Sequence, residues 1–113
     1  MPDPRLPRLM SRNLRRGERS CPGHRAWVRK HHCIVPGCAN RQIESAHVRA
    51  GTDGGTSLKP SDRWCVSLCR NHHLEQHKFG EKTFERKYAI DLLELAAAFA
   101  ARSPHRRKLR EES

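Results

Sequence analysis

Aromatic residues and long apolar runs are both scarce in this sequence. Its 113 residues include three Phe, two Trp and one Tyr, and hydrophobic residues make up 35% of the chain. No stretch is apolar enough to span a bilayer, and no N-terminal apolar run has the length of a signal peptide. A chain of this length forms one domain, and apolar burial alone would leave that domain marginally stable. We therefore expect a further stabilising element.

Acidic residues are also in short supply. The chain has 12 Asp and Glu against 23 Lys and Arg, so its formal net charge is +11. The electric field of such a positive charge attracts polyanions, and nucleic acid is the first candidate partner. The charge alone also fits a ribosome-bound, lipid-bound or merely soluble basic protein. We expect residues 1–20 to be a disordered basic arm and residues 105–113 a basic tail, either contacting phosphates or simply solvated. Residues 21–104 then form the domain.

Apolar spacing and turn residues predict a small α+β domain, in which a hairpin is followed by helices. The expected elements are a helix at residues 24–32, strands at 44–49 and 63–68, and helices at 71–79, 81–88 and from Asp91 onward. Gly80 suits a left-handed cap at the end of its helix, and Asp91 and Glu94 have the spacing of a capping box. Pro104 should stop the last helix.

Five cysteines and eight histidines favour metal ligation in a reducing cytosol over disulfides, and we expect a cytoplasmic, nucleoid-associated protein. Cys33 and Cys38 are separated by four residues, and Cys69 and His72 by two. Together the two pairs can form a Cys3His tetrahedron around Zn²⁺, which would supply the stability that a thin core lacks. The alternative is that they are ordinary buried cysteines.

Two cysteines fall outside this set. If the second strand is extended, Cys65 lies roughly 13 Å from Cys69, at about 3.3 Å per residue, and the two cannot share an ion. We interpret Cys65 as a small strand residue, and Cys21 as an unassigned thiol or an accessory ligand.

His73 and His77 form a second constellation. They lie one helical turn apart and therefore on one face, where they can grip a single metal ion. His72 is rotated by about 100° from His73 and faces a different ion. His47 lies on the first expected strand, and a neutral imidazole can take a proton from water beside a metal that stabilises the charge on a scissile phosphate. Each histidine alone is more often structural, so only the surrounding pattern favours a site.

The order of these features resembles the HNH, or ββα-metal, nucleases. In both, a cysteine pair precedes a strand with a histidine, a Gly-rich loop, a second strand, a further ligand pair and a helix with histidines. Within that superfamily, the stretch SAHVRAGTDGGTSLKPSDRWCVSLCRNHHLEQH and the following FGEKTFERKYAIDL are similar to small phage and prophage proteins related to the Ref recombination-enhancement nuclease. The resemblance covers about residues 24–104.

The resemblance implies a metal-dependent DNA endonuclease of phage or prophage recombination or DNA processing, with a recombination protein filament as a candidate partner. It implies that His47 is the general base, and that His73 and His77 bind a catalytic Mg²⁺ or another divalent cation. The structural zinc ligands that it implies are Cys33, Cys38, Cys69 and His72.

The sequence departs from the family pattern at two places. Ala46 stands where many HNH proteins carry a metal-binding Asp or His, and aligning His47 with that ligand instead puts Val48 in the place of the base. The middle asparagine of the family name has no clear counterpart; Asp62 lies near its expected place, where it can complete the metal shell, orient His47 or form a turn. Ala46 supports an alternative function, a non-catalytic zinc-stabilised nucleic-acid-binding module.

Basic residues flank this candidate site in the sequence: Arg49, Lys59, Arg63 and Arg70. Phosphate contacts from such side chains are independent of base sequence, which predicts weak base specificity and strong salt dependence. A toxin or restriction component would share the same chemistry in another biological setting.

Overall fold

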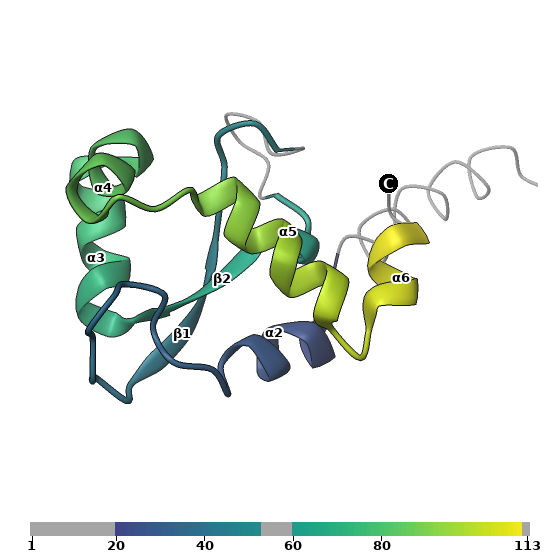
Figure 1. The fold of residues 1–113 in the computed structure, drawn as a ribbon. Helices are drawn as coiled ribbons and strands as arrows, with labels where there is room; N and C mark the ends of the chain where they lie inside the picture. Colours follow the sequence, from purple (N-terminus) through teal and green to yellow (C-terminus); the bar gives the residue numbers. More distant parts are fainter. Residues whose placement is uncertain (1–19, 53–59, 112–113) are drawn as a thin grey trace, which may run out of the picture.

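The structure is a computed structural model, and it describes residues 20–52 and 60–111. Its helices and strands follow one another as α2 (Pro22–Val28), β1 (Ile43–His47), the 3₁₀ turn η1 (Asp62–Trp64), β2 (Cys65–Cys69), α3 (Arg70–Phe79), α4 (Glu81–Tyr88), α5 (Leu92–Arg102) and α6 (Arg106–Glu111) (Figure 1). The predicted α+β class is confirmed. None of the described helices is both long and apolar enough to cross a bilayer.

The two strands form an antiparallel hairpin in which Ile43 pairs with Cys69 and His47 with Cys65. Side chains alternate between the two faces of a strand, so Ala46 and its neighbour His47 point in opposite directions. Ala46 is buried in the main apolar core with Val66 and Leu68, against residues of α4 and α5. Helix α2 lies across both strands. The hairpin therefore separates the main core from the surface that carries His47.

Several element ends differ from the sequence-based expectation. The first helix ends at Val28 rather than at residue 32, and residues 62–64 form a 3₁₀ turn before the second strand begins. Gly80 has φ 88° and ψ 158°, so it is an extended glycine with positive φ and not the predicted left-handed helical cap. The Asp91 cap is confirmed, because its carboxylate accepts a hydrogen bond from the Glu94 amide at 3.0 Å.

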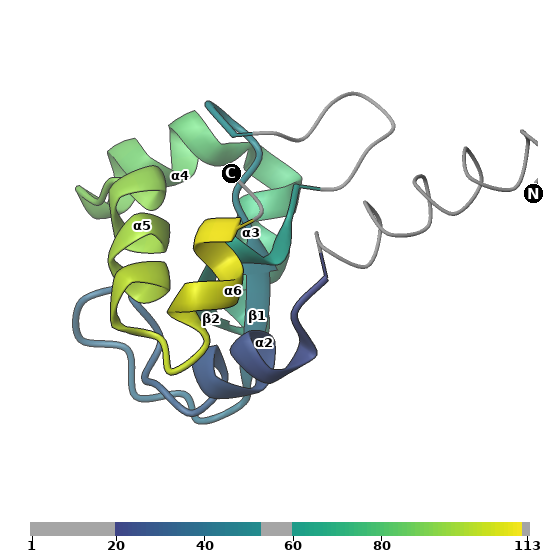
Figure 2. The same ribbon diagram turned by 90° about the vertical axis from the view of Figure 1, so that its right-hand side faces the viewer.

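The segment after Pro104 is folded, which corrects its interpretation as a basic tail. Residues 106–111 form α6, and Leu109 is buried in a small second cluster with Cys21 and Ala100. Figure 2 shows α6 against α5 and close to the start of α2. A single leucine in a charged segment has no apolar period, so its burial was not visible in the sequence. The expected basic arm lies outside the described residues, except for Ser20.

Candidate metal centre and catalytic pocket

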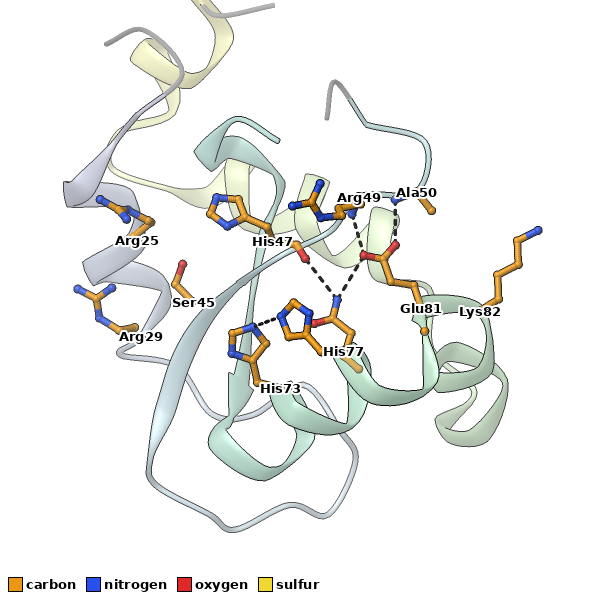
Figure 3. A pocket seen from close by; sticks show the side chains of 12 residues that line it. Arg25, Arg29, Ser45, His47, Arg49, Ala50, His73, His77, Glu81 and Lys82 are labelled. Atoms are coloured by element: carbon orange, nitrogen blue, oxygen red, sulfur yellow. Dashed lines mark hydrogen bonds between the residues drawn. The ribbon is translucent and has the colours of Figure 1, made fainter. Parts of the chain in front are cut away.

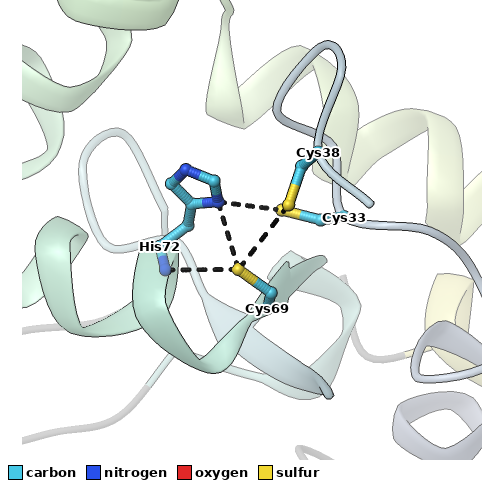
Figure 4. A group of neighbouring side chains, drawn as sticks. All are labelled: Cys33, Cys38, Cys69 and His72. Atoms are coloured by element: carbon cyan, nitrogen blue, oxygen red, sulfur yellow. Dashed lines mark hydrogen bonds between the residues drawn. The ribbon is translucent and has the colours of Figure 1, made fainter. Parts of the chain in front are cut away.

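Four potential metal ligands meet where the loop before β1 approaches the start of α3. They are Cys33, Cys38, Cys69 and His72, and their ligand atoms all lie within 4.8 Å of one another (Figure 4). The Sγ atoms of Cys38 and Cys69 are 3.8 Å apart, and His72 Nδ1 lies 3.1 Å from Cys69 Sγ. The structure thus brings together the two ligand pairs that the spacing predicted.

These residues fit a zinc ion in geometry and in chemistry. Tetrahedral Zn²⁺ with Zn–S bonds of about 2.3 Å places its sulfurs about 3.8 Å apart. Cys69 is also the N-cap of α3, where its sulfur accepts the His72 amide, so the helix start holds both ligands. Burial raises the pKa of the Cys33 thiol to about 11, and a bound cation is what would stabilise its thiolate. The cluster can hold a metal ion.

A pocket of about 770 Å³ lies between α2, the edge of β1 and α3 (Figure 3). His47 lines it from β1, and His73 and His77 line it from α3. Four cationic side chains also line it: Arg25, Arg29, Arg49 and Lys82. The three imidazoles that the sequence singled out therefore share one cavity with several cations, while Ala46 is not among its lining residues.

His47 faces a buried carboxylate. Its Nε2 atom lies 2.9 Å from Asp62 Oδ1, and Asp62 also accepts the Cys21 amide at 2.6 Å and pairs with Arg25 at 3.1 Å. Burial is the largest single influence on the pKa of Asp62, and it raises this pKa because it opposes ionisation. The bonds from His47 and from the Cys21 amide, with the Arg25 charge, outweigh it and lower the pKa. Asp62 is thus a carboxylate that points at His47, the position that orienting this imidazole requires.

His73 and His77 point their Nε2 atoms at each other across 3.2 Å. His73 Nδ1 donates to Glu44 Oε1 at 2.7 Å. This bond places the proton of a neutral His73 on Nδ1 and leaves the Nε2 lone pair directed at His77, as a shared cation requires. Glu44 was missed in the sequence, because nothing there links a strand carboxylate to a helix 29 residues later.

Two further polar residues hold the end of β1 against the helices, and both were missed in the sequence. Gln76 is buried, and its amide donates to the backbone oxygen of His47 at 3.3 Å and to Glu81 at 3.4 Å. Glu81 in turn accepts the backbone amides of Arg49 and Ala50 at 2.7 and 2.9 Å. The only sequence signal was the position of Gln76 between the two paired histidines of α3.

The basic residues predicted to contact phosphates do not all lie at this pocket. Arg49 lines the pocket, but Arg63 lies over the Trp64 ring at 4.7 Å and borders a separate hollow beside α5 and α6. Arg70 begins α3 and is not among the pocket residues, and Lys59 lies outside the described residues. Arg63 of η1 lies on the side of α5 and α6, and Arg70 lies at the start of α3, next to Cys69 of the cysteine cluster. Arg25 of α2 and Arg29, the residue that caps the end of α2, line the pocket instead, and only their spacing of one helical turn signalled this.

The two remaining cysteines occupy different environments. Cys21 is buried beside Ala100 and Leu109, away from the Cys3His cluster, so it is part of the core and not an accessory ligand there. Cys65 is buried opposite His47 in the hairpin, and its Sγ lies within 4.8 Å of ligand atoms of His47 and Asp62.

Comparison with known families gives one match. A family model described as "Putative HNHc nuclease" matches residues 19–96, which include the cysteine cluster, the hairpin and α3. No curated protein and no solved structure matches the chain significantly.

Proposed function

Because this chain belongs to the HNH nuclease family, we propose that it is a metal-dependent endonuclease that hydrolyses DNA phosphodiester bonds in the pocket between α2, β1 and α3. The observation that carries this proposal is the meeting of His47, backed by a buried carboxylate, with His73 and His77 in one cationic cavity. Its cofactors are a structural Zn²⁺ at the Cys3His cluster and Mg²⁺ or another divalent cation in the pocket.

His47 acts as the general base. Asp62 accepts the Nε2 proton of the neutral imidazole, which leaves the lone pair of Nδ1 to take a proton from water. The same carboxylate stabilises the imidazolium that forms, as the orienting carboxylate of a catalytic triad does. Asp62 therefore sets both the tautomer of His47 and its ability to hold the transferred proton.

His73 and His77, whose Nε2 atoms face each other, would hold the catalytic cation, and Glu44 fixes the tautomer of His73. When bound, a divalent cation stabilises the negative charge that develops on the scissile phosphate and leaving oxygen. The arginines on the pocket wall, Arg29 and Arg49 among them, contact neighbouring phosphates. Such contacts orient the backbone without reading base edges, so cleavage should depend weakly on sequence.

For the biological setting, we propose DNA processing or recombination by a phage or prophage protein at the bacterial nucleoid, with a recombination protein filament as a partner. The support is the sequence resemblance to Ref-related proteins described above, together with the net charge of +11.

The test is a plasmid-nicking assay with purified protein and either Mg²⁺ or Mn²⁺. We expect His47→Ala to lower the nicking rate by about 100-fold or more, the usual contribution of a general base. His73→Ala should lower it as strongly through loss of the cation. His32→Ala is the matched control, because His32 is exposed and does not line the pocket, and it should nick at the wild-type rate.

The alternative function is the non-catalytic DNA-binding module, for which Ala46 is the motivating feature. In the structure Ala46 belongs to the apolar core, so a ligand side chain there would point away from the His47 surface. If the wild-type protein binds DNA but does not nick it with Mg²⁺ or Mn²⁺, the endonuclease proposal is overturned. The non-catalytic DNA-binding module is then the function that remains.

A further inference from the structure

A third group of potential metal ligands includes the proposed base. His47 of β1, Asp62 of η1 and Cys65 of β2 each offer one ligand atom, and these three atoms lie within 4.8 Å of one another. The antiparallel register places Cys65 directly opposite His47, and η1 brings Asp62 to the same end of the hairpin. This group shares no residue with the Cys3His cluster.

We propose that His47, Asp62 and Cys65 form a second Zn²⁺ site, whose occupation removes His47 from proton transfer. The inhibition rests on the proposed nuclease function, whereas the binding of the ion does not. Zinc thereby acts in two opposite ways on this chain, as a structural ion at the Cys3His cluster and as an inhibitor at the hairpin end.

The donor set decides which ion the site takes. A thiolate, an imidazole and a carboxylate are all ligands of Zn²⁺, whereas Mg²⁺ prefers oxygen ligands and retains water. Thiolate ligands in particular select zinc and other soft transition metals. Zn²⁺ is therefore expected to bind here in the presence of excess Mg²⁺.

Burial and charge around Cys65 disfavour a free thiolate and favour a thiolate that is bound to a cation. Burial raises the pKa of the Cys65 thiol to about 12, and the negative charge of Asp62 adds to this rise. The same charge attracts a divalent cation, whose binding displaces the thiol proton into solvent. Asp62 keeps its bond from the Cys21 amide, and the partly exposed Arg25 side chain can move toward solvent.

The tautomer of His47 explains the inhibition. In the structure the Nε2 atom of His47 faces Asp62, so zinc between them takes the lone pair of Nε2. The imidazole proton moves from Nε2 to Nδ1, and one proton, that of the Cys65 thiol, leaves for solvent. Nδ1 then carries a proton and cannot accept another from water. The proposed base is blocked without any change in the fold.

Binding is tested by cobalt spectroscopy on the full chain. The Cys3His cluster is first filled with one equivalent of Zn²⁺, and Co²⁺ is then titrated as the probe. We expect a thiolate-to-cobalt charge-transfer band that is lost in Cys65→Ala and retained in Cys21→Ala, since Cys21 is equally buried but lies outside the group. Cys65→Ser serves as the second variant should the alanine chain not fold. A band that persists in the Cys65 variants, or no band in the wild type, overturns the site.

Inhibition is tested separately in the nicking assay. With Mg²⁺ constant, added Zn²⁺ should lower the wild-type rate by about 100-fold, the scale on which a general base acts. Cys65→Ala should nick at the wild-type rate without added zinc and should resist inhibition. Equal inhibition of both proteins overturns the proposal. A Cys65-dependent cobalt band in a chain that never nicks DNA would refute the nuclease function and leave the zinc site standing.

Discussion

Gln76 of α3 donates a hydrogen bond of 3.3 Å to the backbone oxygen of His47 on β1. This bond crosses from the helix that carries the paired histidines to the strand that carries the proposed base. It therefore joins the two elements that supply the three histidines of the pocket directly.

Replacing Gln76 by Met, which keeps the volume and removes the amide, should destabilise the fold by about 1–3 kcal/mol, because buried polar groups lose their partner. If the tie positions His47, kcat for nicking should also fall while KM changes little. Denaturant unfolding and steady-state nicking measure the two effects. Gln42→Met is the control, because Gln42 is exposed. Equal behaviour of the two variants would refute a positioning role.

Removing the structural zinc should unfold the domain. Its apolar core is small, and zinc binding in small domains supplies a large share of the folding free energy, of the order of 10 kcal/mol. Strong chelation should abolish the cooperative thermal transition followed by circular dichroism, and Cys38→Ala should purify without the structural ion. Cys65→Ala should fold and retain that ion. An unchanged melt after chelation would show that the ligand set is wrong.

His24 makes stability depend on pH below neutrality. The side chain is fully buried, Nδ1 bonds to Ser103 Oγ at 2.8 Å, and burial lowers its pKa from 6.5 to about 4. As the pH falls, His24 therefore binds a proton at a higher pH in the unfolded chain than in the folded one. The stabilisation is complete above pH 6.5 and is lost between pH 6.5 and 4, by roughly 3 kcal/mol in all.

The measurement is the unfolding free energy of wild type and His24→Gln across this window, with zinc held in excess. The difference between the two proteins should shrink as the pH falls, whereas His32→Gln should follow the wild type. Protonation of the zinc ligands affects all three proteins alike, so it cancels in the comparison. A difference that is constant with pH would mean that His24 is not held neutral by burial.

Arg29 should contribute to DNA affinity through phosphate contact. It is exposed, lines the pocket, and lies one helical turn from Arg25. Arg29→Ala should weaken binding to all sequences alike and reduce the slope of log affinity against log salt by about 1. Arg70→Ala, an exposed arginine outside the pocket, should leave the slope unchanged. Fluorescence anisotropy at several salt concentrations measures both slopes. If Arg70→Ala lowers the slope and Arg29→Ala does not, the DNA binds outside the pocket.

The features that could be predicted from the sequence are those set by local geometry. Cys69 and His72 lie at one helix start, and His73 and His77 lie one turn apart, so the spacing alone fixes which side chains share a face. The Asp91 cap and the stop before Pro104 are equally local. The sequence was a poorer guide where an outcome depended on distant partners, as for the placement of Arg63 and Arg70 and for the burial of Leu109 in α6.

By itself, the sequence determined the α+β class, the two ligand pairs and the histidine pair on α3, because residues close in the chain have few ways to be arranged. Only the tertiary structure decided that Asp62 contacts His47, that Cys65 lies opposite His47, and that Arg25 and Arg29 line the pocket. These contacts depend on strand register and on how the helices pack against the sheet. Both are set by burial summed over the whole chain, which no short stretch of residues encodes.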